Sequence, residues 1–248
     1  PADAALPESL LADAHYANGV LLSQQDRHAE ALRSLRSSLE LRRRLDDRAG
    51  QAACLNSLGI VAWRRQSFLE ATRYLEESLA LRRQLGDANL GPPLNNLGLV
   101  ALAQGHFRRA ESHLLELLRR ERERGQEMGI AISLGNLALA VLEQGRLDEA
   151  RAHLAASATL FHKFKDREGL AGCLETAAAL AVALDDPTRA ATLCAAAATL
   201  RQEIHVPLTT VERGRYEKTL AAAQSSLHPD AFTTAWDRGV HLSLDQAL

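Results

Sequence analysis

The side chains that could catalyse a reaction or hold a metal ion are scattered along this sequence. It contains nine histidines and three cysteines, but no His-Glu-x-x-His motif, no Cys-x-x-Cys pair, no Ser-His-Asp arrangement and no glycine-rich nucleotide loop. His113 and His153 lie 40 residues apart, with no carboxylate or cysteine at a metal-binding spacing. We therefore expect no enzymatic activity, no metal site and no cofactor.

Asparagines inside predicted helices could bind a ligand through hydrogen bonds. Asn is a mediocre helix-interior residue because its side chain competes for backbone hydrogen bonds. Four nevertheless lie within apolar helical patterns: Asn56, Asn95, Asn96 and Asn136. A carboxamide is both donor and acceptor, so it can pair with an extended peptide backbone of any sequence. Alternatively, these amides bridge neighbouring helices or face water, and the sequence leaves both interpretations open.

A repeat of about 40 residues organises the elements that carry these side chains. The octets from Leu55 (LNSLGIVA), Leu94 (LNNLGLVA) and Leu134 (LGNLALAV) are near copies. Five alanines follow at intervals of 40, 39, 40 and 40 residues: Ala31, Ala71, Ala110, Ala150 and Ala190. Twelve residues before each stands a small residue: Gly19, Gly59, Gly98, Ala138 and Ala178. Small residues at both positions let two helices approach closely, so each unit is predicted to be a helix pair.

Turn-forming residues separate the predicted helices. Breaks within units fall at Asp26, Gln66–Ser67, Gly105, Gly145 and Asp185–Asp186–Pro187. Breaks between units fall at Asp46–Asp47, Gly86–Asp87, Gly125 and Lys165–Asp166. Each predicted helix is about 17 residues long, or roughly 25 Å.

The spacing of these small residues, together with the leucine three residues before each Leu-Gly pair, resembles the tetratricopeptide repeat family. The common unit of that family has about 34 residues, and the longer unit here is similar to those of Pins-type scaffolds, kinesin light chains and the arms of large bacterial regulators. The resemblance covers roughly residues 8–205. It implies an all-α, right-handed superhelical solenoid over residues 1–206, with five helix-turn-helix repeats at about 8–46, 47–86, 87–125, 126–165 and 166–206.

The period is lost after residue 206, and residues 207–248 are expected to form capping helices. Thr209 and Glu212 are spaced as a capping box for a helix through about Ser226. Pro229 suits the first turn of another helix, and the pair Ser243 and Gln246 indicates a third start. A terminal repeat has no neighbour to cover its apolar face, so a divergent cap is expected there.

The same tail carries a second resemblance. It is similar to the end of the helical arm in LuxR-, MalT- and AfsR-like STAND ATPase regulators of bacteria at Ala231–Phe232, Ala235–Trp236, Gly239 and Leu242–Ser243–Leu244. The resemblance implies that the chain is the sensor arm of such a regulator, whose ATPase and DNA-binding modules lie elsewhere. Because the chain begins at Pro1 and not at a methionine, we expect it to be part of a longer protein.

The tetratricopeptide resemblance also implies that the first helix of each repeat lines a concave groove. The groove positions selected as the partner-binding site are Tyr16, Asn56, Trp63, Arg64, Asn95, Asn96, Leu99, Asn136, Leu139 and Glu143. Chaperone-binding relatives clamp a terminal carboxylate with basic residues at positions that here hold Tyr16, Asn56, Asn95, Gly135 and Glu175. That clamp is therefore not expected. The predicted ligand is a partly apolar segment of a protein or peptide, including one from the parent protein itself.

Charge and composition argue against nucleic-acid binding and a membrane span, and they indicate the cellular compartment. The formal net charge of −2 supplies no basic field for nucleic acid, and the arginines at 42–44 and 119–124 are interpreted as a solvated outer face. The longest apolar stretch, from Ile130 to Leu142, is too short to cross a bilayer. The odd number of cysteines without a disulfide pattern indicates reduced thiols and a cytoplasmic protein.

The sequence thus favours a non-catalytic binding scaffold, with the sensor or partner-binding arm of a bacterial STAND-type transcriptional regulator as the leading hypothesis. A small-molecule inducer is an additional candidate ligand. The alternatives are a free-standing adaptor that binds peptides and the regulatory arm of a signalling enzyme, such as a cyclase or kinase.

Overall fold

The computed structural model describes residues 6–86 and 89–242, and every regular element within those ranges is an α-helix. The predicted all-α class is confirmed. The chain forms two compact units, Pro1–Val100 (unit 1) and Ala101–Leu248 (unit 2), and the boundary lies within helix α5. The helices α1 to α10 fall two by two within the five predicted repeat ranges.

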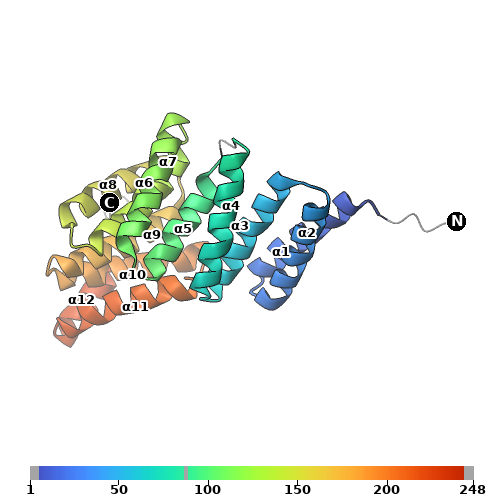
Figure 1. Ribbon diagram of the computed structural model, residues 1–248. Helices are drawn as coiled ribbons and strands as arrows, with labels where there is room; N and C mark the ends of the chain where they lie inside the picture. Colours follow the sequence, from blue (N-terminus) through green and yellow to red (C-terminus); the bar gives the residue numbers. More distant parts are fainter. Residues whose placement is uncertain (1–5, 87–88, 243–248) are drawn as a thin grey trace. The chain divides into compact units, whose positions relative to one another are not determined.

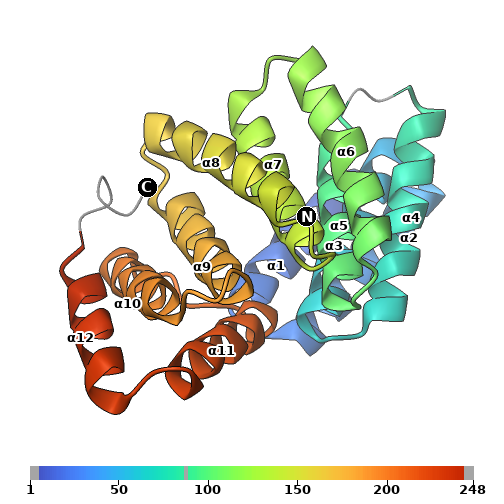
Figure 2. The ribbon, with the colours of Figure 1, turned by 90° about the vertical axis from the view of Figure 1, so that its left-hand side faces the viewer.

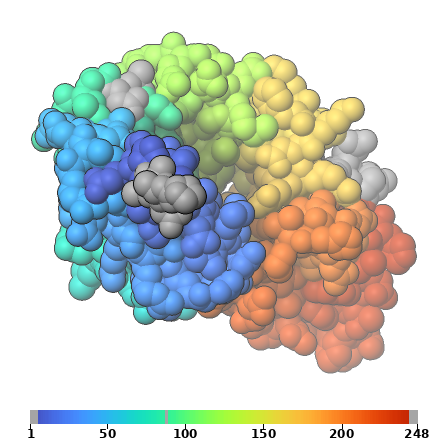
Figure 3. Space-filling model, turned by 90° about the vertical axis from the view of Figure 1, so that its right-hand side faces the viewer, coloured from blue at the N-terminus to red at the C-terminus, as the bar shows by residue number. Residues whose placement is uncertain are grey.

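Unit 1 contains α1 (Glu8–Gln24), α2 (His28–Arg44), α3 (Arg48–Arg64), α4 (Phe68–Gln84) and most of α5 (Gly91–Ala103) (Figure 1). Helix α1 packs on α2, α2 on α3 and α3 on α4, and α1 and α2 form the blue surface in Figure 3. A β-carbon added at Gly19 would lie 2.6 Å from Cγ of Leu35, and one at Gly59 would lie 2.6 Å from Cγ of Leu75. The close helix contact inferred from the small residues is therefore present here.

Unit 2 contains α6 (Phe107–Glu123), α7 (Glu127–Leu142), α8 (Leu147–Phe164), α9 (Arg167–Ala183), α10 (Pro187–Ile204), α11 (Thr210–Ser225) and α12 (Pro229–Val240). Helices α6 to α10 pack in chain order. Helix α11 then runs beside α9 and α10, and α12 returns along α10 (Figure 2). None of the described helices is long and apolar enough to cross a membrane.

The five register alanines are core residues. Each is at most 1% exposed: Ala31, Ala71, Ala110, Ala150 and Ala190. Packing at these positions leaves no room for a larger side chain, because protein interiors are close-packed. The 40-residue register read from the alanines is thus the register of the helix pairs.

The predicted breaks are tight turns with one residue in the left-handed region. Within units these residues are Asp26, Gln66, Gly105, Gly145 and Asp185, and between units they are Asp46, Gly86, Gly125 and Lys165, all with φ between 52° and 76°. Glycine adopts this conformation freely, whereas other L-residues pay a steric cost. A backbone N–H just beyond the turn bonds back to the preceding helix, as from Ser67 to the Ala62 carbonyl over 2.9 Å.

Buried serines link the two helices of several pairs. Ser38, Ser78 and Ser157 donate from Oγ to the carbonyls of Ala12, Ala52 and Ala131 over 2.8, 2.7 and 2.8 Å. Donor and acceptor are 26 residues apart in each case. Each serine thereby satisfies its hydroxyl inside an apolar contact, which is the condition for burying it.

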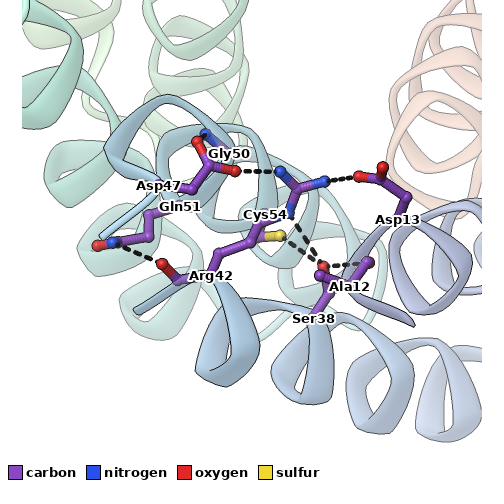
Figure 4. Close-up of polar contacts among 8 residues, drawn as sticks. All are labelled: Ala12, Asp13, Ser38, Arg42, Asp47, Gly50, Gln51 and Cys54. Carbon is purple, nitrogen blue, oxygen red and sulfur yellow. Dashed lines mark hydrogen bonds and ion pairs between the residues drawn. The ribbon is translucent and has the colours of Figure 1, made fainter. Parts of the chain in front are cut away.

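Arg42 departs from the solvated role expected for the arginines at 42–44. Its side chain is only 13% exposed and forms ion pairs with Asp13, at 2.6 Å, and with Asp47 (Figure 4). A β-carbon at Gly50 would lie 1.9 Å from Arg42 Nη1, so a glycine is needed to admit the guanidinium. Arg42 of α2 therefore contacts α1 and the start of α3. The prediction that it faces solvent was wrong, because the space that its guanidinium fills is left by Gly50, which lies on the next helix.

The tail forms the predicted cap helices as far as it is described. Thr209 accepts a bond from the Glu212 backbone N–H, and the Glu212 carboxylate accepts one from the Thr209 N–H, which is the expected capping box. Pro229 begins α12, also as expected. Thr192 Oγ1 donates to the Ala235 carbonyl over 3.1 Å and so links α12 to α10. The third predicted start, at Ser243 and Gln246, lies outside the described residues.

Candidate functional site

The first-helix face of unit 1 is formed by seven of the predicted site residues on α1, α3 and α5. Each is half-buried: Tyr16, Asn56, Trp63, Arg64, Asn95, Asn96 and Leu99. Nδ2 of Asn96 donates to Oδ1 of Asn56 over 3.1 Å, joining α5 to α3. An amide has two donor hydrogens and an acceptor oxygen with two lone pairs, so this single bond leaves hydrogen-bonding capacity on both side chains. Bridging helices and binding a partner are therefore compatible roles.

Two further bonds join α3 to α1 along the same face. Ser57 Oγ donates to the Tyr16 hydroxyl over 3.3 Å. Arg64 Nη1 donates to the Ser23 carbonyl over 2.8 Å. First helices that are 40 residues apart in sequence are thus direct neighbours, as the repeat resemblance implies.

Trp63 contributes an unusual donor to this face. It follows Asn56 by seven residues, so both side chains lie on one side of α3. The indole Nε1 is buried and has no hydrogen-bond acceptor among the residues that the structure describes. Buried Trp N–H groups usually have a partner, so this donor is a candidate contact for a bound carbonyl.

Unit 2 holds a cavity of about 830 Å³, called here the C-terminal cavity. The three remaining predicted site residues all line it: Asn136 and Leu139 of α7, and Glu143 at the C-cap of that helix. Other first-helix positions of α7 and α9 also do so: Ile132, Gly135, Leu142, Glu175, Thr176 and Val182. The predicted concave positions of this unit therefore surround one space, with apolar side chains over much of its wall.

A buried ion pair between Arg201 and Glu175 forms part of the cavity wall. Arg201 Nε lies 2.8 Å from Glu175 Oε1, and Arg201 Nη2 lies 3.2 Å from Glu175 Oε2, which makes the pair bidentate. The two side chains are 10% and 16% exposed. Burial raises the pKa of Glu175, although the hydrogen bond from Arg201 acts to lower it. Because the two side chains bond to each other, the other polar groups of the cavity are better candidates for contacts with a ligand.

Helix α11 closes one side of the cavity with residues that sequence reasoning assigned only to a cap. They are Glu212, Arg215, Tyr216, Lys218, Thr219 and Ala222. The capping box correctly located the start of this helix, but its path is outside the repeat period. No periodic signal in the sequence could have placed it against α9.

The described residues contain no group of three or more His, Cys, Asp or Glu side chains able to hold a metal ion. The three thiols are free and buried. The first-helix face of unit 1 offers hydrogen bonds and apolar contact, and the C-terminal cavity offers charged groups as well.

Comparison with known proteins places these surfaces in a family context. A model described as Tetratricopeptide repeat matches residues 10–84 and 58–123, and a second model of that description matches residues 130–161. No curated protein sequence matches the chain.

Several solved structures share the fold at low identity. A Rap protein complexed with competence and sporulation factor is 14% identical, with a TM-score of 0.64, over 94% of this chain and 68% of that chain. BtubC (BKLC) from P. vanneervenii is 17% identical, with a TM-score of 0.59, over 86% and 92%. The Rap conjugation gene regulator of plasmid pLS20, in complex with the Phr* peptide, is 16% identical, with a TM-score of 0.59, over 97% and 67%.

Proposed function

Since the chain belongs to the tetratricopeptide repeat family, we propose that it is a non-catalytic scaffold that binds a segment of a protein or peptide. Two of the structurally similar proteins are themselves complexes with a factor or peptide, and this supports the assignment. The segment is expected to be partly apolar, because the predicted groove positions are largely uncharged.

The observation that carries the proposal is the polar pattern of the first-helix face in unit 1. Trp63 presents a buried indole N–H without an acceptor among the described residues, and Asn56 and Asn96 keep spare donors and acceptors beside their mutual bond. A peptide backbone supplies carbonyls and N–H groups at regular intervals, so it can satisfy all three side chains without a particular sequence.

The finer assignment is to the sensor or partner-binding arm of a STAND-type transcriptional regulator in the bacterial cytoplasm. Its support is the similarity of the tail around Trp236 and Gly239 to the ends of such arms. The flanking sequence of the full-length gene tests this directly. A nucleotide-binding P-loop upstream supports the assignment, whereas a start codon close to Pro1 indicates a free-standing adaptor.

The binding proposal is tested through Trp63 fluorescence. The chain has two tryptophans, so Trp236→Phe leaves Trp63 as the only reporter. Peptides of about 12 residues are selected from a phage-displayed library against this variant and titrated. We expect a change in Trp63 emission on binding and less than about a threefold loss of affinity between roughly 0.05 and 0.5 M salt, because the face is mainly uncharged.

Asn56→Ala combined with Asn96→Ala is expected to weaken the selected peptide by about tenfold. The free energy of unfolding should change by less than about 1 kcal/mol, since removing both partners of a bond leaves no orphaned group. Asn18→Ala, an exposed asparagine on α1 that donates to Ser34 over 2.9 Å, is the matched control and should bind normally. Unchanged peptide affinity in the double variant would contradict the proposal.

A further inference from the structure

The C-terminal cavity has an apolar body and a charged wall. Leu139, Leu142 and Val182 are among its apolar lining residues, while most of the ionisable lining groups lie on α9, α10 and α11. At about 830 Å³ it falls within the roughly 300–1,000 Å³ typical of small-molecule sites. All of its lining residues belong to unit 2.

The inner carboxylates of this wall are already engaged. Glu175 is held bidentate by Arg201. The Glu212 carboxylate accepts bonds from the Thr209 N–H, at 2.9 Å, and from its hydroxyl, at 2.8 Å. Two other lining carboxylates, Glu143 and Glu168, are exposed to solvent.

Asp166 also lines the cavity, and its carboxylate caps α9 by accepting from the Gly169 N–H over 3.0 Å. Glu175, Glu212 and Asp166 therefore accept hydrogen bonds from the protein itself, whereas Glu143 and Glu168 are solvated.

Arg215 is the exception among the inner charges. Within the described part of the chain, its guanidinium makes no hydrogen bond or ion pair. Burial lowers its pKa, against the nearby carboxylates of Glu212, Glu175 and Glu143, which raise it. Arg215 is one of the lining residues of the cavity, so its side chain is on the cavity side of α11.

A partly buried arginine that makes no direct ion pair is uncommon, because proteins pair the charges that they remove from water. Helix α11 is fixed in this position by its packing on α9 and α10, by its capping box and by a 3.1 Å bond from the Tyr216 hydroxyl to the Cys194 carbonyl. The arginine is thus held at the wall by a well-anchored helix.

We propose that the C-terminal cavity binds a small amphipathic anion, with its carboxylate or phosphate on the guanidinium of Arg215 and its apolar body against Leu139, Leu142 and Val182. A guanidinium forms two parallel hydrogen bonds to either kind of oxyanion. The apolar wall gains from burying a hydrocarbon or aromatic body. This site lies in unit 2 and is independent of peptide binding on the first-helix face of unit 1.

The experiment compares an anionic and a neutral probe of the same body. 1-Anilinonaphthalene-8-sulfonate and N-phenyl-1-naphthylamine are titrated into the folded full chain by fluorescence. Octanoate, octyl phosphate and 1-octanol are then used as competitors. We expect octanoate or octyl phosphate to displace the sulfonate at about tenfold lower concentration than 1-octanol does, and the better of the two identifies the head group.

Arg215→Met should weaken the sulfonate and the best anionic competitor by about tenfold or more, and change the neutral probe by less than about twofold. Its Tm should change little, since Arg215 makes no direct hydrogen bond or ion pair that the substitution would break, whereas loss of a structural arginine would lower Tm. Arg213→Met, an exposed arginine of the same helix outside the cavity lining, is the matched control and should bind like the parent.

Three results would overturn the proposal: equal affinity for charged and neutral probes, equal effects of Arg213→Met and Arg215→Met, or displacement of the sulfonate by peptides selected on Trp63. Peptide binding reported by Trp63 is measured on the same variants. If the anion proposal is wrong, the peptide-binding proposal can therefore still be judged from its own measurement.

Discussion

The three cysteine thiols are expected to react slowly because they are buried. Cys54, Cys173 and Cys194 are all buried and free. Burial raises the pKa of Cys173 to about 11 and that of Cys194 to about 12, and it also raises the pKa of Cys54. The thiolate is the reactive form of cysteine, so these residues are poor candidates for redox or metal chemistry in the folded protein.

At pH 8 we expect the rate at which Ellman's reagent labels the three cysteines of the native protein not to exceed the rate at which the protein unfolds. The urea-unfolded chain should be labelled rapidly. The ordinary thiol pKa of 9.0 lies below the folded values. The free energy of unfolding is therefore not reduced by thiol ionisation below pH 9. It decreases as the pH rises towards 11–12, because the thiols of the unfolded chain ionise and the buried ones do not. Fast labelling of a thiol in the native protein would contradict its buried position.

The turns between helices set the register at the scale of the element. Six described non-glycine residues occupy the left-handed region, among them Gln66 with φ of 59°. At equivalent turns, Gly105 and Gly145 adopt the same conformation without strain. The repeat thus tolerates a poor turn residue because packing on both sides holds the chain in place.

Gln66→Gly is expected to raise the free energy of unfolding by about 1 kcal/mol, since it relieves a left-handed conformation that costs other residues roughly 1–2 kcal/mol. Urea denaturation measures the change. Arg65→Gly is the control: Arg65 has φ of −80° and ψ of 2°, so glycine there only adds flexibility to the unfolded chain. A stabilising Arg65→Gly would show that the gain has another source.

At the scale of the whole molecule, the cap completes unit 2 and shapes its cavity. Gly239 of α12 touches α10 so closely that a β-carbon would lie 2.1 Å from the Thr192 carbonyl oxygen. Backbone cannot move aside as a flexible side chain can. The docking of α12 against α10 therefore requires a residue without a β-carbon at position 239.

Gly239→Ala is expected to destabilise the protein by about 1–3 kcal/mol through overpacking, and to speed hydrogen exchange selectively in α12. Gly214→Ala in α11, where a β-carbon would meet nothing within 4 Å, is the matched control. It should stabilise by up to about 1 kcal/mol through helix propensity. Equal exchange rates in α12 of the parent and Gly239→Ala would show that this contact is not needed for docking.

The repeat pattern accounts for how much of the fold could be predicted. Gly59 with Ala71, and the turn residues after each helix, recur at a fixed spacing because every pair solves the same local packing problem. The helix pairs, their breaks and the first-helix positions of Asn56 and Asn136 could therefore be read from spacing alone. The domain boundary at residue 206 and the STAND parentage stay predictions.

Tertiary structure decided what lies outside the repeat. Arg42 forms an ion pair with Asp13, which lies 29 residues earlier in the chain on another helix. Arg215 reaches the C-terminal cavity because α11 crosses beside α9. Sequence by itself determined the helices and their small-residue contacts, since these are local and periodic. The partners of single charged groups depend on how distant helices pack, and no spacing along the chain records that.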